Sequence, residues 1–353
     1  MPEETTLKFG VIGAGKIGTF HTRTLAKMPG VNLVGVCDPD LMRAQKLAWQ
    51  YNATPYSKME DLVGQVDAVI VAAPTQLHHQ IGVYCLEHGV HTLVEKPIAS
   101  TLEQARDLIR AAKQHERVLQ VGHVERFNPA VVEAVKYIDH PKFITMNRLG
   151  PYDARMSNIG VVLDLMIHDI DLLLTLVPSE VKSIDATGMS VFSAHEDIAN
   201  VRIRFADGTL ADLTASRASF ERARFMHLFQ QDAYISVDFM NARVKMYKKE
   251  KPVISSMQDL TVIYPPVQKQ LPITAEILHF IDCIKTHKTP APSGEKGSKA
   301  LELALKITEQ IRRFDIPKTE HIHTPKPLQM VQDVAKAAQM MLGETLGQFK
   351  QDK

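Results

Sequence analysis

The sequence predicts an α/β protein that begins with a doubly wound parallel sheet and continues into an α+β domain with a large, mostly antiparallel open sheet. Apolar, strand-like runs alternate with helical segments from residue 7 to residue 122, a pattern typical of parallel sheets. From His123 onward, strand-like runs follow one another through short connections, which antiparallel strands can use and parallel strands cannot. We therefore predict two domains, residues 1–123 and residues 124–353.

The stretch from Leu7 to Asp38 predicts a strand, a glycine turn, a helix and a second strand. Its turn reads Gly13-Ala14-Gly15-Lys16-Ile17-Gly18. Gly13 allows a tight turn, Gly15 lets the backbone approach a pyrophosphate, and Gly18 lets the helix pack closely on the strand. The phosphates would lie at a helix N-terminus, where free N–H groups favour negative charge. This pattern predicts a Rossmann dinucleotide-binding domain in which Gly13, Gly15, Lys16, Ile17 and Gly18 contact the cofactor.

Asp38 ends the second strand, about 20 residues after Gly18. A carboxylate at this place accepts hydrogen bonds from the adenosine ribose hydroxyls and repels a 2′-phosphate. We therefore expect NAD as the cofactor, although the nearby Arg43 leaves NADP open.

The rest of the first domain alternates in the same way. A helix is predicted over 41–52, and strands over Val66–Ala73, His91–Val94 and Val118–Gly122 complete a sheet of about six. The run ending at Ala73 opens into a loop at the carboxyl end of its strand, where such sheets bind ligands. Pro74, Thr75 and His78 are therefore predicted to lie beside the nicotinamide. The alternative for His78 is that it only begins the next helix.

The second domain is predicted to contain seven strands: 142–149, 181–187, 200–205, 210–216, 224–229, 234–238 and 243–247. Asp207-Gly208 and Asn241-Ala242 are predicted hairpin turns. Helices are expected over 276–287, 296–313 and 328–346, the last docked on the body or on a partner. Because an open antiparallel sheet of this size needs cover, we expect a homodimer or homotetramer formed through the sheet.

Composition excludes several classes of function. The 353 residues include 41 basic and 40 acidic side chains spread along the chain, which argues against a nucleic-acid partner or a membrane-surface patch. No apolar run has the length of a membrane span, and the first strand begins too early for a signal peptide, so we expect a cytoplasmic protein. Cys37, Cys85 and Cys283 lie far apart and are expected to be reduced core thiols.

Glu95-Lys96-Pro97 ends one of the strands of the first domain, where side chains project over the ligand cleft. Glu95 and Lys96 are predicted to contact the cofactor. A lysine ammonium beside an alcohol also stabilises the alkoxide that develops during hydride loss. The alternative is a solvated lysine with no role in the chemistry.

Residues 160–175 have helical apolar spacing, and Asp164, His168 and Asp171 fall on one face of the predicted helix. Histidine is the usual base for an alcohol proton near neutral pH, and an aspartate four residues earlier can orient its ring. The alternatives are a satisfied core histidine and a metal ligand. We predict no metal site here, because no second histidine with suitable spacing lies nearby.

A polar stretch, residues 122–129, joins the two domains. Arg126 suits a phosphate or carboxylate, because its guanidinium offers paired donors. Asn128 either contacts a substrate hydroxyl or caps the following helix. Arg148 and Arg155 flank a Gly-Pro loop and are predicted to supply further anion contacts.

At this point the chain resembles the Gfo/Idh/MocA oxidoreductases. The resemblance rests on GVIGAGKIG, the Ala-Pro-Thr turn at 73–75, Glu95-Lys96-Pro97, the helix with Asp164 and His168, and Pro292-Ser293-Gly294-Glu295. It implies NAD-dependent hydride transfer on sugars, cyclitols or related alcohols, and oligomers formed through the second sheet. Lys96, Asp164 and His168 match the catalytic residues of the family and would also contact the substrate. Met166 departs from the family, since many members have glycine there.

Within the family, residues 121–130 and 160–171 are most similar to the UDP-N-acetylglucosamine 3-dehydrogenase branch. This resemblance implies a nucleotide-sugar substrate whose 3-hydroxyl becomes a ketone, before a transaminase installs an amine for lipid A. Two alternatives stay open: an inositol or free-sugar dehydrogenase of the same fold, and a non-catalytic NAD-dependent sensor that regulates a partner protein.

Overall fold

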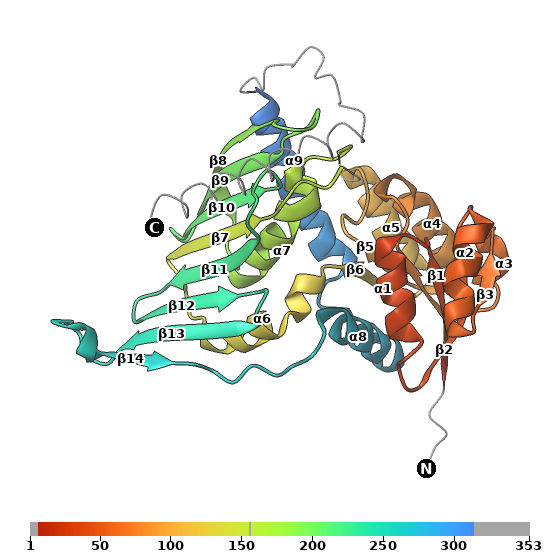
Figure 1. Ribbon diagram of the computed structural model, residues 1–353, viewed down its shortest axis with the longest axis horizontal. Coiled ribbons are helices and arrows are strands. Elements are labelled where there is room, and N and C mark those ends of the chain that lie inside the picture. Colours follow the sequence, from red (N-terminus) through yellow and green to blue (C-terminus); the bar gives the residue numbers. More distant parts are fainter. Residues whose placement is uncertain (1–5, 155–156, 314–353) are drawn as a thin grey trace, which may run out of the picture. The chain divides into compact units, whose positions relative to one another are not determined.

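The computed structural model describes residues 6–154 and 157–313, whose strands form two sheets (Figure 1). The first sheet is parallel throughout, with the order β3-β2-β1-β4-β5-β6. Its strands are β1 (Leu7–Ile12), β2 (Val31–Cys37), β3 (Thr54–Tyr56), β4 (Ala68–Val71), β5 (His91–Glu95) and β6 (Leu119–Gly122). This confirms the predicted doubly wound sheet. The order reverses between β1 and β4, so ligands are expected at the carboxyl ends of these strands.

Helices cover both faces of the first sheet. They are α1 (Lys16–Leu25), α2 (Leu41–Ala48), α3 (Met59–Val63), α4 (Thr75–Glu87), α5 (Leu102–Gln114) and, from later in the chain, α8 (Pro272–Thr286). One core joins α1, α2 and α8, with the ring of Phe280 packed edge-on against Phe9 at 6.1 Å between centroids. The other core joins α3, α4 and α5. The predicted helix over 41–52 is shorter, because Asn52 adopts a left-handed conformation with φ 55° after a 3-10 turn.

The second sheet has eight strands in the order β14-β13-β12-β11-β7-β10-β9-β8. They are β7 (Phe143–Leu149), β8 (Val181–Met189), β9 (Ile198–Phe205), β10 (Leu210–Ser216), β11 (Ala223–Phe229), β12 (Ala233–Asp238), β13 (Arg243–Lys249) and β14 (Leu260–Ile263). All neighbours are antiparallel except β7 and β10, which run parallel. The predicted, mostly antiparallel sheet is confirmed, and only β14 was not expected.

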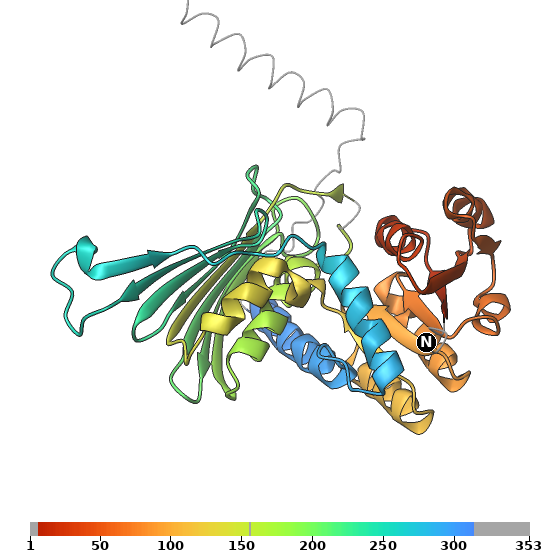
Figure 2. The same ribbon diagram turned by 90° about the horizontal axis from the view of Figure 1, so that it is seen from below.

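Helices α6 (Pro129–Ala134), α7 (Ile167–Leu176) and α9 (Gly294–Arg313) lie on one face of the second sheet (Figures 1 and 2). Inward side chains such as Val201 and Ile203 alternate with exposed ones along the strands, as expected for a sheet with one buried face. The opposite face carries aromatic side chains, including Phe229, Tyr234 and Tyr247, and no helix from the described part of the chain. Oligomer formation through this face stays a prediction.

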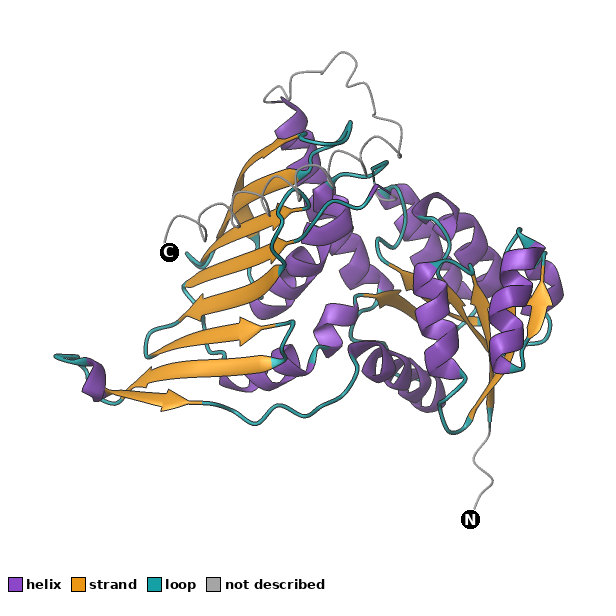
Figure 3. Cartoon of the chain, in the orientation of Figure 1, coloured by secondary structure: helices purple, strands orange, loops and turns teal. Residues whose placement is uncertain are grey.

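A long loop after β14, residues 264–271, leads the chain into α8, which packs against the first sheet (Figure 3). The following helix, α9, places Leu301 in a core of the first sheet and Ile307 in the core of the second. The predicted division after residue 123 therefore coincides with the end of β6, but residues far beyond it complete the first core. That division stays a prediction.

The structure also bears on three other expectations from the sequence: the state of the cysteines, membrane spans and the predictions that fall outside the described residues. Cys37, Cys85 and Cys283 are buried free thiols. Within residues 6–154 and 157–313, no helix is long and apolar enough to cross a membrane. The helix predicted over 328–346 and the predicted anion contact Arg155 lie outside the described residues.

Candidate active site

The glycine turn after β1 has the geometry that its sequence predicts. Gly13 has φ 107°, and a Cβ on it would lie 2.5 Å from the Ala72 carbonyl oxygen. A Cβ on Gly18 would collide with the Gly13 carbonyl. Around Gly15, by contrast, no heavy atom lies within 4 Å of the position that a Cβ would take. The N-terminus of α1, which starts at the exposed Lys16 and Ile17 and has no side-chain cap, is therefore open to a pyrophosphate.

Asp38 lies directly beside this turn. Its Oδ2 accepts a hydrogen bond of 2.9 Å from the Ala14 N–H, and its Oδ1 accepts one of 3.0 Å from the Asp40 N–H. The carboxylate thus ties the end of β2 to the glycine turn and keeps lone pairs for ribose hydroxyls. Arg43 Nη1 is 3.9 Å from Asp38, and its Nη2 is 3.6 Å from Asp40. Arg43 therefore lies between two carboxylates, which disfavour a 2′-phosphate.

The loop after β4 brings Pro74 to the N-cap of α4 and Thr75 to its first turn. His78 is buried, with Nδ1 2.9 Å from the Pro97 carbonyl oxygen and Nε2 2.8 Å from the Ala73 carbonyl oxygen. Burial lowers the pKa of His78, so its ring is neutral and donates to one of these oxygens at a time. His78 therefore links the loops after β4 and β5, and its predicted place beside the nicotinamide stays a prediction.

The carboxyl end of β5 carries Glu95 and Lys96. Glu95 Oε1 lies 2.7 Å from His21 Nε2, and its Oε2 accepts a hydrogen bond from the Lys96 N–H. The Lys96 ammonium donates to the main-chain oxygen of Asp164 at 2.6 Å and lies 3.6 Å from Asp164 Oδ1. The lysine is therefore largely buried and paired, which argues against the solvated alternative.

The segment that carries Asp164 is a π-helix, Val162–Met166, which continues into α7. The single α-helical face predicted for Asp164, His168 and Asp171 is therefore wrong in its first turn, because a π turn rotates its residues relative to the following α-helix. Asp164 faces Lys96, whereas Asp171 accepts two hydrogen bonds of 2.6 Å from Arg126. In the described residues, Asp164 and His168 share no hydrogen bond, so no direct contact supports the prediction that Asp164 orients the His168 ring.

His168 is partly exposed, and its buried Nδ1 has no hydrogen-bond partner among the described residues. Burial and the positive charges of Lys96 and Arg148 lower the pKa of His168 well below 6.5. The ring is therefore neutral at physiological pH, which is the form that accepts a proton. This electrostatic state suits the predicted general base.

Arg148 is buried in an ion-pair cluster. Its guanidinium donates to Asp169 at 2.7 Å through Nη2 and to Glu125 at 2.7 Å through Nη1. Contact with a substrate, as predicted for Arg148, would require these pairs to break. The alternation of β7 indicates this burial, because Arg148 lies on the same face as Ile144 and Met146. Asp169 and Glu125 were not singled out from the sequence.

Arg126 and Asn128 also have partners within the chain. Besides its pair with Asp171, Arg126 donates to the Ala291 carbonyl oxygen at 2.8 Å. Asn128 Oδ1 accepts from the Ala130 N–H at the start of α6, which confirms the capping alternative. Its Nδ2 donates to Glu125, so the side chain is satisfied without a ligand. The predicted substrate contacts of both residues stay predictions.

Arg224, in β11, is a further cation at this cluster that sequence reasoning missed. It lies opposite Arg148 in the sheet register, and its Nη1 is 3.6 Å from Glu125 Oε1. Unlike Arg148, its side chain is 46% exposed. Its charge also contributes to the lowered pKa of His168, which places it within electrostatic reach of the candidate base.

Two family models match the chain. Residues 7–123 match the oxidoreductase family with an NAD-binding Rossmann fold, and residues 143–235 match the GFO/IDH/MocA C-terminal domain. The chain belongs to the Gfo/Idh/MocA oxidoreductase family. Because both the nucleotide-binding and the C-terminal parts match, membership rests on the whole architecture rather than on the glycine turn.

Relatives with named activities match most of this chain over nearly all of their own length. UDP-N-acetylglucosamine 3-dehydrogenase from Acidithiobacillus ferrooxidans is 32% identical over 313 residues, which cover 87% of this chain and 98% of that protein. A solved structure of that enzyme matches with a TM-score of 0.82 at 32% identity, over 87% of this chain and 98% of that chain. An NAD-dependent scyllo-inositol 2-dehydrogenase from Bacillus subtilis is 26% identical over 88% of this chain and 95% of its own length.

These matches establish the general activity of this family member. The chain is an NAD-dependent dehydrogenase that acts on a hydroxyl of a sugar or polyol. The open N-terminus of α1 and the carboxylate of Asp38 fit the pyrophosphate and the ribose of that cofactor. Within this family, Lys96, Asp164 and His168 remain our predicted catalytic residues.

Proposed function

We propose that this dehydrogenase oxidises the 3-hydroxyl of UDP-N-acetylglucosamine to a ketone. The observation that carries the proposal is the relative of that activity, which is similar along 98% of its own length. The inositol dehydrogenase is less similar, although it covers a comparable share of the chain. An inositol or free sugar is therefore the second candidate substrate.

The proposed chemistry uses Lys96, which follows β5, and His168, which lies in the first turn of α7. Bound NAD supplies the acceptor for the hydride that leaves the substrate carbon. His168, neutral because of its depressed pKa, takes the hydroxyl proton. The Lys96 ammonium stabilises the negative charge that develops on the oxygen, and Asp164 holds that ammonium in place.

Unlike an inositol, a nucleotide sugar carries a diphosphate, whose negative charge favours a cation at the site. Arg126 donates to Asp171 and to a main-chain carbonyl oxygen, and Arg148 donates to two carboxylates. Arg224, by contrast, is half-exposed and has one loose contact with Glu125. Arginine binds phosphate oxygens with paired donors. We therefore assign Arg224 to the diphosphate.

We further propose that the protein is a cytoplasmic homodimer or homotetramer. The subunits would join through the face of the second sheet that carries Phe229, Tyr234 and Tyr247. Its 3-keto product would pass to a transaminase that installs an amine for lipid A. Size measurement of the purified chain in solution tests the oligomer separately from the chemistry.

The decisive experiment is absorbance at the reduced-nicotinamide band after the purified chain is mixed with NAD and one substrate. UDP-N-acetylglucosamine, myo-inositol and glucose are compared by absorbance without an acceptor. Parallel reactions contain an added ketone, which takes the hydride from a cofactor that is retained between turnovers, and these are analysed for the keto product by mass spectrometry. We expect a rise with the nucleotide sugar, and a 3-keto product by mass spectrometry. A rise only with myo-inositol or glucose would overturn the nucleotide-sugar assignment and leave the dehydrogenase intact. No turnover of any substrate by a chain that binds NAD would favour the sensor alternative.

A further inference from the structure

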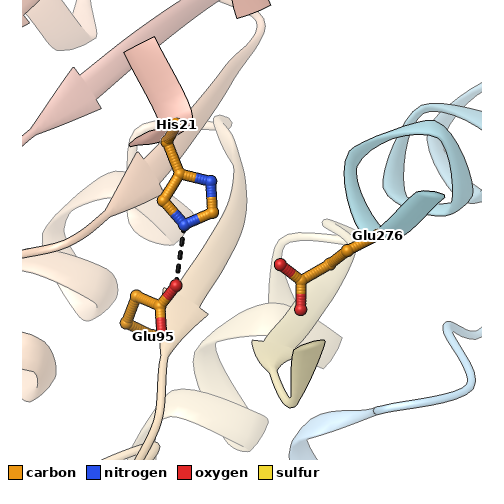
Figure 4. Close-up of side chains that lie close together, drawn as sticks. All are labelled: His21, Glu95 and Glu276. Carbon is orange, nitrogen blue, oxygen red and sulfur yellow. Dashed lines mark hydrogen bonds and ion pairs between the residues drawn. The ribbon is translucent and has the colours of Figure 1, made fainter. Parts of the chain in front are cut away.

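Three titratable side chains from distant parts of the chain meet on the α1 and α8 face of the first sheet. They are His21 from α1, Glu95 from the end of β5 and Glu276 from α8, and their ligand atoms lie within 4.8 Å of one another. Figure 4 shows the Glu276 carboxylate pointing toward the His21–Glu95 pair. In residues 6–154 and 157–313, no other group of three such side chains gathers as closely.

The polar atoms of this cluster are incompletely paired. Both carboxylate oxygens of Glu276 are buried without a hydrogen-bond partner among the described residues, and so is His21 Nδ1. His21 and Glu276 are each 0% exposed. Gln120 donates its amide to the Glu276 carbonyl oxygen, yet its own Oε1 is also buried and unpaired. Buried carboxylates without partners are costly, so this arrangement requires a proton, a cation or ordered water.

We propose that His21, Glu95 and Glu276 bind a divalent transition-metal ion, Zn²⁺ or Mn²⁺. One imidazole nitrogen and two carboxylate oxygens form a donor set that suits these ions. Two carboxylates would also neutralise the double charge, which a buried site requires. The site shares Glu95 with the predicted cofactor contacts, but no step of the proposed hydride transfer uses the ion, so the inference goes beyond the function proposed above.

The three ligand atoms lie at nearly the separation that one ion requires. Metal–ligand distances of about 2.0–2.2 Å place donor atoms at most roughly 4.4 Å apart, close to the 4.8 Å within which the ligand atoms of His21, Glu95 and Glu276 lie. The ion would also displace the proton in the 2.7 Å contact between His21 and Glu95, since metal ligands must be deprotonated. Glu95 is 15% exposed and offers the entry path. The bound ion would connect α1, β5 and α8 around the strand end that carries Lys96.

The competing explanation is a protonated Glu276. Burial and the charge of Glu95 raise the pKa of Glu276 well above its ordinary value, which a bound proton would satisfy electrostatically. The two explanations differ for Glu276→Gln. A glutamine imitates the protonated acid in shape and charge but is a poor metal ligand. If Glu276 is protonated, the variant should keep the stability of the wild type; if the cluster binds metal, the variant should lose the ion.

The test uses the full chain after treatment with a chelator, incubated separately with Zn²⁺ and with Mn²⁺, then desalted and analysed for bound metal. His21→Gln and Glu276→Gln are compared with the wild type, and His115→Gln is the matched control, because His115 is exposed and remote in sequence from the cluster. Melting temperature and circular dichroism without metal show whether each variant folds. No substrate is present, so the result is independent of the proposed activity.

We expect one ion of at least one of the two metals per chain in the wild type and in His115→Gln, and loss of that ion in the two cluster variants. Saturating metal should raise the melting temperature of the wild type by about 5 °C and leave folded Glu276→Gln unchanged. Equal metal content in folded Glu276→Gln and the wild type, or no bound ion in the wild type, would overturn the proposal. In the second case, a metal-free Glu276→Gln that melts at or above the wild type would support the protonated carboxyl.

Discussion

The Lys96 ammonium donates a hydrogen bond of 2.6 Å to the main-chain oxygen of Asp164. Lys96 follows the last residue of β5 in the first sheet, and Asp164 lies in the π-helix that leads into α7 beneath the second sheet. The contact therefore fixes the cation of the candidate site with a group from the other half of the chain. Because π turns are frequent at functional sites, this local departure from an α-helix is consistent with a catalytic role.

Lys96→Met should lower kcat by about 10²- to 10⁴-fold, because the cation that stabilises the alkoxide is lost while most of the aliphatic stem remains. The dissociation constant of NAD should change far less than kcat, since the variant removes one predicted cofactor contact and leaves the glycine turn and Asp38 untouched. Steady-state kinetics and NAD titration check both parts. Wild-type kcat in this variant would refute the assignment of Lys96.

His168→Ala should lower kcat/KM by about 10²- to 10⁴-fold and remove the acid limb of its pH profile. In the wild type, burial and Lys96 depress the pKa of His168 well below 6.5, so the base is lost only as the pH falls through that lower value. The acid limb of kcat/KM should therefore have its midpoint below pH 6.5. A midpoint at or above pH 7 that disappears in His168→Ala would contradict this electrostatic picture.

Arg148→Met should destabilise the fold by about 3–5 kcal/mol, because Glu125 and Asp169 are left buried without their counter-ion. Urea unfolding at pH 7 measures the loss. The double variant Arg148→Met, Asp169→Asn should recover part of it by removing one unpaired charge. Unchanged stability with a raised KM would instead support the substrate contact predicted from the sequence.

Arg224→Met is the matched comparison on the neighbouring strand. Its side chain is 46% exposed, so the free energy of unfolding should change by less than about 1 kcal/mol. If Arg224 binds the diphosphate, the KM for UDP-N-acetylglucosamine should rise roughly 10- to 100-fold with a much smaller effect on kcat. An unchanged KM would show that Arg224 does not contact the substrate.

His91 predicts a pH dependence of stability. It is buried and accepts a hydrogen bond of 3.0 Å from the Val118 N–H, and burial lowers its pKa to about 4. The unfolded chain, with a histidine pKa near 6.5, binds the proton first as the pH falls. The stabilisation is therefore complete above pH 6.5 and declines between pH 6.5 and pH 4.

Between pH 6.5 and pH 5, the wild type should lose up to about 2 kcal/mol more than His91→Asn, whose oxygen can still accept from Val118. Urea unfolding at the two pH values gives the difference, with His115→Asn as an exposed control. Parallel losses in the wild type and His91→Asn would show that other groups dominate the acid sensitivity.

Local patterns in the sequence were sufficient to predict the two sheets and the NAD cofactor. Apolar strand-like runs, the glycine turn and the acid after β2 are features of short stretches of sequence, so they can be recognised without knowing the fold. They predicted all strands of the two sheets except β3 and β14, and the motifs indicated the family. The burial of Arg148 could also have been inferred, because it continues the inward positions of β7.

Only the tertiary structure decided which charged groups are paired. Arg148 meets Glu125 and Asp169, Arg126 meets Asp171, and Arg224 is left half-exposed. The π-helix, which turns Asp164 toward Lys96, likewise depends on contacts across the chain. His21, Glu95 and Glu276 converge from three separate elements and share no spacing in the sequence. Such pairings follow from the packing of distant segments, and the free energy of a buried charge is set by what that packing places beside it.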